Sequence, residues 1–186
     1  LTQVEAAARA AAVSDVRYAL RLDLVANAAT FRGHIVTRFA LAAGHAGPIF
    51  LCFRGRTIHS LTLNGVVIDA PEWSGYRLTL PAARLKAGSE NLLEVSYENA
   101  YDTGGDGVFR FIDPEDQNEY VYTNFEPYEA HRMAPLFDQP DIKAKLSLTV
   151  VAPAAWRVFG NGAETATSPD GVGGTLHTFA ETPPLA

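Results

Sequence analysis

The residues best suited to chemistry lie between Tyr122 and Ala144, a segment that shows no regular apolar period. Within it, Asn124 and Glu126 stand two positions apart, and Pro127 follows the acid. Residues i and i+2 of an extended chain project to the same side, so a carboxamide and a carboxylate would face one space. Such a pair can receive an ammonium group through charge-assisted hydrogen bonds. Alternatively, both are turn residues in contact with water, and their spacing alone leaves this choice open.

The histidines do not form a zinc peptidase motif. That motif needs two histidines one helical turn apart with a glutamate beside the first, so that both imidazoles reach one metal. No two of the five histidines are four positions apart; they are His34, His45, His59, His131 and His177. Glu129 and His131 would share one face of an extended segment, but two ligands do not hold zinc. We interpret these two as solvated loop residues.

Other catalytic chemistries are no better represented. The chain has no Gly-x-Ser-x-Gly elbow for a serine nucleophile. Cys52 lies in an apolar stretch, where a thiol behaves as a small, inert hydrophobic side chain. Gly104–Gly107 lacks the Lys-Ser/Thr pair of a phosphate-binding loop, so we interpret it as a turn. We therefore predict no catalytic residue and no metal site in this chain.

The overall composition is that of one globular domain. A chain of 186 residues can bury a sizeable core, and its net charge of -6 argues against nucleic acid or an anionic membrane as a partner. No apolar run approaches the ~18 residues of a membrane span, and the N-terminus lacks the basic-then-apolar order of a secretory signal. Cys52 is the single cysteine, which excludes an internal disulfide. We expect a cytoplasmic location, although a secreted protein without disulfides would have the same cysteine count.

Two kinds of local pattern divide the chain. Residues 2–13 are rich in alanine with Glu5 in the first turn, which predicts a short helix. We expect this helical segment, residues 1–14, to be weakly tethered. From Asp15 the apolar period changes to two, which predicts a β-rich domain over residues 15–186.

The expected strands are short and numerous. They lie at residues 20–24, 34–41, 49–53, 58–68, 76–80, 92–97, 107–112, 119–123, 144–151, 156–160 and 175–179. Asn64-Gly65 divides the fourth of these into a hairpin, because both residues tolerate positive φ. Gly160–Gly174 is rich in turn residues and reads as a hairpin loop. The pattern predicts an all-β fold, an antiparallel sandwich or saddle-like sheet.

The central segment also resembles a known motif. YTNFEPYEAHRMAPLFDQPDIKA, residues 122–144, is similar to a hallmark of the aminopeptidase-N family of zinc metallopeptidases, the gluzincins. That hallmark runs roughly Thr-Gln-Phe-Glu-Pro, a spacer, Ala-Arg-Arg, then Phe-Pro-Cys-Phe-Asp-Glu-Pro. SDVRYALRLDL at 14–24, LTLNG at 61–65 and FAETPP at 179–184 resemble other family pieces in the expected order. The resemblance therefore covers nearly the whole chain.

The resemblance implies the N-terminal domain of such an enzyme, a β-rich saddle that packs against a thermolysin-like catalytic domain. The zinc ligands and the Gly-x-Met-Glu-Asn motif belong to that next domain, and neither is present here. The final TFAETPPLA resembles the end of a domain cut from a longer protein. We thus expect zinc and removal of N-terminal residues from peptides in the full-length protein, and an inactive isolated domain. The expected partners are peptide N-termini and the catalytic domain.

By the same resemblance, Glu126 corresponds to the acid that binds the substrate α-amine. Asn124 corresponds to the glutamine that lines the first side-chain pocket, and is one methylene shorter. The family is expected to carry a cis peptide directly after this acid, and cis costs only ~0.5–1 kcal/mol before proline. We therefore predict a cis Glu126–Pro127 bond. Arg132 and Asp138 are predicted to pair or cap within the loop, with independent solvation of the two side chains as the alternative.

Two alternatives of another class remain. A non-catalytic β-sandwich binding module would share the fold without ever joining a peptidase. An all-β domain that recognises protein surfaces fits the composition but has no residue-level support. The sequence beyond Ala186 separates these alternatives from the aminopeptidase, since the peptidase motifs would follow there.

Overall fold

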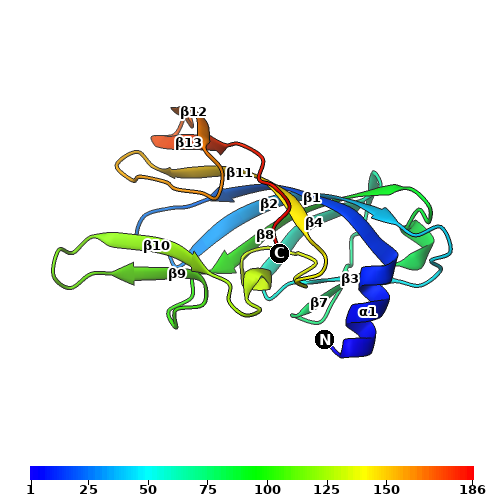
Figure 1. The fold of residues 1–186 in the computed structure, drawn as a ribbon. Helices are drawn as coiled ribbons and strands as arrows, with labels where there is room; N and C mark the ends of the chain where they lie inside the picture. Colours follow the sequence, from blue (N-terminus) through cyan, green and yellow to red (C-terminus); the bar gives the residue numbers. More distant parts are fainter.

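The computed structural model describes residues 1–186, and strands dominate it (Figure 1). The elements in chain order are α1 (Gln3–Ala12), β1 (Val13–Asp23), β2 (Thr30–Leu41), β3 (Ile49–Cys52), β4 (Thr57–Leu63), β5 (Val66–Val67), β6 (Glu72–Trp73), β7 (Arg77–Leu80), η1 (Ala82–Arg84), β8 (Glu90–Ala100), β9 (Gly107–Ile112), β10 (Glu119–Asn124), η2 (Ala130–Arg132), β11 (Ala144–Pro153), β12 (Glu164–Pro169) and β13 (Gly174–Phe179). The predicted all-β fold with a short N-terminal helix is confirmed.

One large sheet carries two smaller ones. Its eight strands run in the order β12-β13-β11-β1-β2-β8-β4-β5. The three-stranded sheet β3-β7-β6 and the hairpin β9–β10 lie on the same side of it, at opposite ends (Figure 1). One pairing departs from the antiparallel expectation, because β11 runs parallel to β1. The long connection between these strands, which contains both small sheets, allows the crossover that parallel neighbours require.

The main core lies between the large sheet and the β3-β7-β6 sheet. Alternate residues of the central strands point inward, as period-two patterning predicts, and the buried residues of β2 include Ile35 and Phe39. Leu51 and Leu78 face them from the small sheet and are also fully buried. Burial of this apolar surface stabilises the arrangement at about 25 cal/mol for each Å² removed from water.

Most of the differences from the predicted strands lie in polar or isolated segments. Residues 156–160 form no strand, although Trp156 and Val158 pack beside the small cluster around Phe179 and so give the alternating pattern. Strand β12 falls inside the predicted hairpin loop. All six of its residues are exposed, so no apolar period marks it. The Asn64-Gly65 hairpin is confirmed, with φ of 53° and 82° at the two positions.

The prediction that α1 is weakly tethered is wrong. Thr2 and Glu5 form a capping box at its start, which satisfies free N–H groups of the first turn. Glu5 also pairs with Arg77 of β7, and Arg9 is only 3% exposed. Strand β1 follows α1 directly at Val13. The chain has no helix that is both long and apolar enough to cross a membrane.

Candidate functional site

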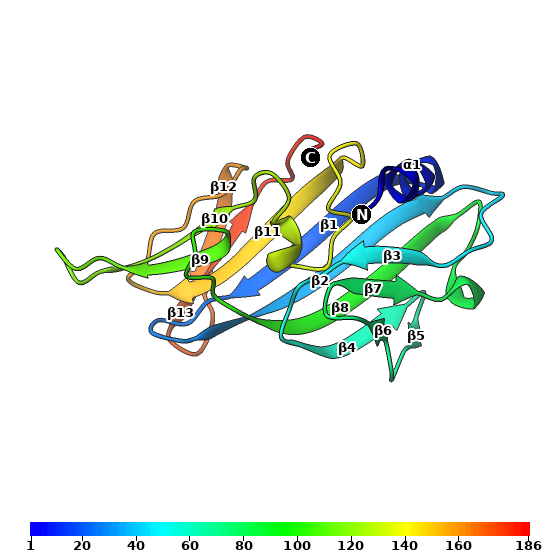
Figure 2. The ribbon, with the colours of Figure 1, turned by 90° about the horizontal axis from the view of Figure 1, so that it is seen from below.

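The segment singled out from the sequence crosses the face of the large sheet that carries the smaller sheets. We call residues 125–143 the crossing loop; it links β10 to β11 and contains η2. Figure 2 shows it between the β9–β10 hairpin and the β3-β7-β6 sheet. Its residues contact all three sheets, through Cys52 of β3, Tyr18 of β1 and Gly107 of β9.

Backbone contacts hold the crossing loop in place. Cys52 and Leu136 form an antiparallel bridge, with N–H···O distances of 2.8 and 3.0 Å in the two directions. The backbone N–H of Phe137 donates to the hydroxyl of Tyr18, at 2.9 Å. These bonds join the loop to β3 and to β1. The loop is irregular in secondary structure but fixed in position.

Arg132 ties the loop to the root of the hairpin. Its Nε donates to Glu129, and its Nη1 donates to Asp102 Oδ2 at 2.6 Å. Burial works to lower the pKa of Arg132, but the pairs with Glu129 and Asp102 outweigh it and raise this pKa. Gly107 lies against the same side chain: a Cβ there would be 2.9 Å from Cβ of Arg132. The start of β9 thus needs a glycine.

Asp138, in the second half of the crossing loop, bonds back to His131. Its Oδ2 accepts from the backbone N–H of His131 at 2.9 Å and lies 2.8 Å from Nδ1 of the same residue. The expectation that Arg132 and Asp138 make pairs or caps within the loop is confirmed. They do not pair with each other: Arg132 pairs with Glu129, and Asp138 bonds to His131. The prediction that Glu129 and His131 are solvated is wrong, because Glu129 is paired and His131 is 3% exposed.

Asn124 and Glu126 lie where β10 passes into the crossing loop, and both are exposed. Asn124 is paired with Gly107 across the hairpin, and its Nδ2 donates to the carbonyl of Gly105 at 3.2 Å. The Glu126–Pro127 peptide bond is cis, as predicted. These two residues stay predicted substrate contacts, because the geometry shows their accessibility but no ligand.

Glu126 differs from the other acids of this segment. Glu129 pairs with Arg132, Asp138 bonds to His131, and Asp141 accepts from Gln139 at 2.6 Å. Glu126 alone makes no hydrogen bond or ion pair within the chain. Its carboxylate is therefore the one in this segment that is free to meet a cation from outside.

The comparisons with known proteins identify the family. The sequence profile of the peptidase M1 N-terminal domain matches residues 14–186. The chain belongs to this family.

Relatives of this M1 domain are considerably longer than the chain. Aminopeptidase N of Streptomyces lividans is 38% identical over 164 residues, which cover 87% of this chain and 19% of that protein. Putative aminopeptidase-2 of Caenorhabditis elegans is 34% identical over 90 residues, 47% of this chain and 5% of that protein. The crystal structure of an M1 zinc metallopeptidase from Deinococcus radiodurans matches with a TM-score of 0.74 at 19% identity, over 93% of this chain and 40% of that chain.

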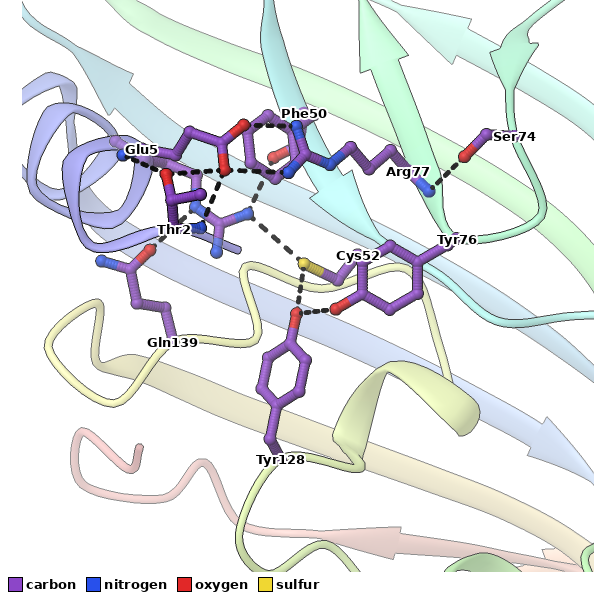
Figure 3. A network of polar contacts seen from close by, with 10 residues as sticks. Thr2, Glu5, Phe50, Cys52, Ser74, Tyr76, Arg77, Tyr128 and Gln139 are labelled. Carbon is purple, nitrogen blue, oxygen red and sulfur yellow. Dashed lines mark hydrogen bonds and ion pairs between the residues drawn. The ribbon is translucent and has the colours of Figure 1, made fainter.

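The M1 domain also contains polar contacts that its sequence did not predict. Cys52, expected to be an inert hydrophobic residue, lies within hydrogen-bond distance of Arg9 Nη1 and of the Tyr128 hydroxyl (Figure 3). These partners are 43 and 76 residues away along the chain, so no local spacing could have connected them. Arg9 gave one weak signal, since it is the single basic residue of α1.

The His, Cys, Asp and Glu side chains of the M1 domain are dispersed. No group of three or more His, Cys, Asp or Glu side chains is arranged to hold a metal ion. The histidines nearest to acids, His131 and His177, each face a single carboxylate. These residues therefore do not fit zinc, and Glu126 is left as an exposed carboxylate without a partner in the chain.

Proposed function

We propose that this chain is the N-terminal domain of a zinc aminopeptidase and that Glu126 binds the α-amine of the substrate peptide. One observation carries the proposal: Glu126 is exposed and unpaired at the start of a loop in which every other acid has a partner. The relatives of this chain in Streptomyces lividans and Caenorhabditis elegans are named aminopeptidases, which supports the proposed aminopeptidase activity of the full-length protein.

The physical basis is the charge that only a free chain end carries. A carboxylate that accepts hydrogen bonds from an ammonium group gains ~1.5–3 kcal/mol, more than a neutral pair would. An internal peptide bond offers no such charge and gains none of this energy. An acid in a fixed position therefore selects N-termini, and it also sets the register of the peptide.

Asn124 is proposed to line the pocket for the first side chain of the peptide. It ends β10 two residues before Glu126, and its amide is already oriented by the Gly105 carbonyl. An amide in this position offers both a donor and an acceptor to the substrate. Removing it should change the preference among first residues more than the requirement for a free amine.

Hydrolysis is proposed to belong to the catalytic domain of the full-length protein, where zinc would activate the attacking water. The residues of this chain bind and orient the substrate. The β-sheet scaffold supplies rigidity, since bonds to β1 and β3 hold the crossing loop. A rigid support is what a positioning contact needs, because small displacements are costly to the rate.

A pair of inhibitors tests the proposal in the full-length protein. Leucine hydroxamate carries the α-amine, and isocaproyl hydroxamate is the same molecule without it. Glu126→Gln should weaken the amine-bearing inhibitor about 10-fold or more and leave the other unchanged. Glu115→Gln is the matched control, because Glu115 is an exposed acid in the turn between β9 and β10. Equal loss of both inhibitors, or no loss, would refute the role of Glu126.

A further inference from the structure

A chain of polar contacts leads from α1 to the turn that carries Glu126 (Figure 3). The turn is closed by a hydrogen bond from Glu129 N–H to Phe125 O, at 3.0 Å. Tyr128 lies inside it, two residues after Glu126. Its ring is directed back toward the β3-β7-β6 sheet, where its hydroxyl finds two partners. The contacts that fix the Tyr128 side chain therefore also fix the turn that contains Glu126.

The hydroxyl of Tyr128 is bound on both sides. Tyr76 donates to it at 2.5 Å, and it donates in turn to the sulfur of Cys52 at 3.0 Å. Burial, and after it these two bonds, raises the pKa of Tyr128. The ring also packs against His131, with centroids 4.8 Å apart. Tyr128 therefore has one well-defined position.

Cys52 connects Tyr128 to the N-terminal helix. The thiol is completely buried, and its sulfur also lies 3.4 Å from Arg9 Nη1. The Arg9 guanidinium stacks on Phe50, 4.5 Å from the ring centroid, and donates to the Phe50 carbonyl at 3.2 Å. A weak sulfur acceptor thus receives one charged and one neutral donor in a site closed to water.

The same guanidinium holds the far end of the crossing loop. Arg9 Nε donates to Gln139 Oε1 at 3.0 Å, and Gln139 Nε2 donates to the Ala6 carbonyl at 2.9 Å. One helix therefore fixes the crossing loop at two places, through Cys52 near its start and directly at Gln139. Removing the helix contacts would release the loop at both.

We propose that Arg9, Cys52 and Tyr128 are positioning residues for substrate-amine binding. They act through the crossing loop and do not touch the peptide. This inference rests on the proposed role of Glu126. It assigns to α1 a part in recognition: the helix holds the Glu126 turn in one position on the domain. The expected consequence is a loss specific to the amine, and not a general loss of fold.

The inhibitor pair described above gives the test, again in the full-length protein. Tyr128→Phe removes one hydroxyl, and Arg9→Met removes the donors but keeps much of the packing volume. Both should weaken leucine hydroxamate about two- to tenfold relative to isocaproyl hydroxamate, the effect of one lost hydrogen bond. Tyr120→Phe is the matched control, because its hydroxyl binds Asp116 at the exposed end of the hairpin; it should change neither affinity.

Two substitutions of Cys52 check that the sulfur acts as an acceptor. The quantity compared is the affinity for leucine hydroxamate divided by the affinity for isocaproyl hydroxamate. Cys52→Ser keeps an acceptor and should retain this affinity ratio. Cys52→Val keeps the bulk of the side chain but no acceptor, and should lower the ratio. If Tyr128→Phe and Arg9→Met weaken both inhibitors equally, or neither, while Glu126→Gln weakens only the amine-bearing one, this inference is wrong and the proposed function stands. If Glu126→Gln also leaves the ratio unchanged, both are wrong.

Discussion

Glu5 and Arg77 are 72 residues apart in the chain, and their side chains form a two-pronged ion pair, with N···O distances of 2.7 and 3.0 Å. The pair fastens the first turn of α1 to β7. It stands one helical turn before Arg9, so both contacts lie on the same face of the helix. Contacts with distant strands, and not interactions within the helix, therefore attach α1 to the domain.

The first prediction concerns acid. The hydrogen bond from Arg77, with those from Thr2, lowers the pKa of Glu5 from 4.5 to about 2. A depressed folded-state pKa contributes stability that is complete above pH 4.5 and is lost as the pH falls toward 2. Glu5→Gln should therefore lower the melting temperature near neutral pH, and the difference from the wild type should shrink across this window. A difference independent of pH would contradict the pair.

The second prediction concerns alkali. Burial raises the pKa of Tyr97 far above its ordinary value of 10.0. A raised folded-state pKa means that stability is complete below pH 10 and falls above it, since the unfolded chain can ionise there and the folded chain cannot. Denaturant titrations of the wild type and Tyr97→Phe should show a steeper loss above pH 10 in the wild type. Parallel curves would contradict the burial.

The third prediction concerns close packing at Gly33 on β2. A Cβ at this position would lie 2.1 Å from Cζ of Tyr97, which is fully buried and cannot move aside cheaply. Gly33→Ala should therefore reduce the free energy of unfolding by about 1–3 kcal/mol. Gly44→Ala is the control, because no atom lies within 4 Å of its Cβ position. Equal stability of the two variants in urea would refute the packing described.

Elements defined by local patterns could be predicted from the sequence, whereas contacts between distant residues could not. Central strands were predictable, because burial on one face imposes an apolar period, as in β1 and β2. Strand β12 was not, because an exposed polar edge strand carries no such period. The attachment of α1 was not predicted for a different reason. Arg9 bonds to Gln139, which is 130 residues away along the chain, and no local pattern in a single sequence indicates such a contact.

Part of the candidate site was also predictable from the sequence. The resemblance of residues 122–144 to a family motif indicated Glu126 and its cis bond, and the structure confirms the cis bond. Periodicity gave no information about the partners of the neighbouring acids. Only the structure shows that Glu126 is unpaired, because the partners of Glu129 and Asp138 depend on how the loop folds back on itself.

The fourth prediction concerns the isolated chain of 186 residues. Because it has no cluster of metal ligands and its proposed role is recognition, it should bind no stoichiometric zinc and release no amino acid from leucyl substrates. Elemental analysis and a chromogenic leucyl substrate check both points. Turnover by the isolated chain would contradict the assignment of catalysis to another domain.

The most direct measurement of the central claim is the kcat/KM of the full-length protein for a leucyl substrate, with zinc content measured in parallel. Glu126→Gln removes the charge that is proposed to bind the α-amine and should lower kcat/KM about 10- to 100-fold with zinc content unchanged. A variant within twofold of the wild type would show that this carboxylate does not recognise the substrate.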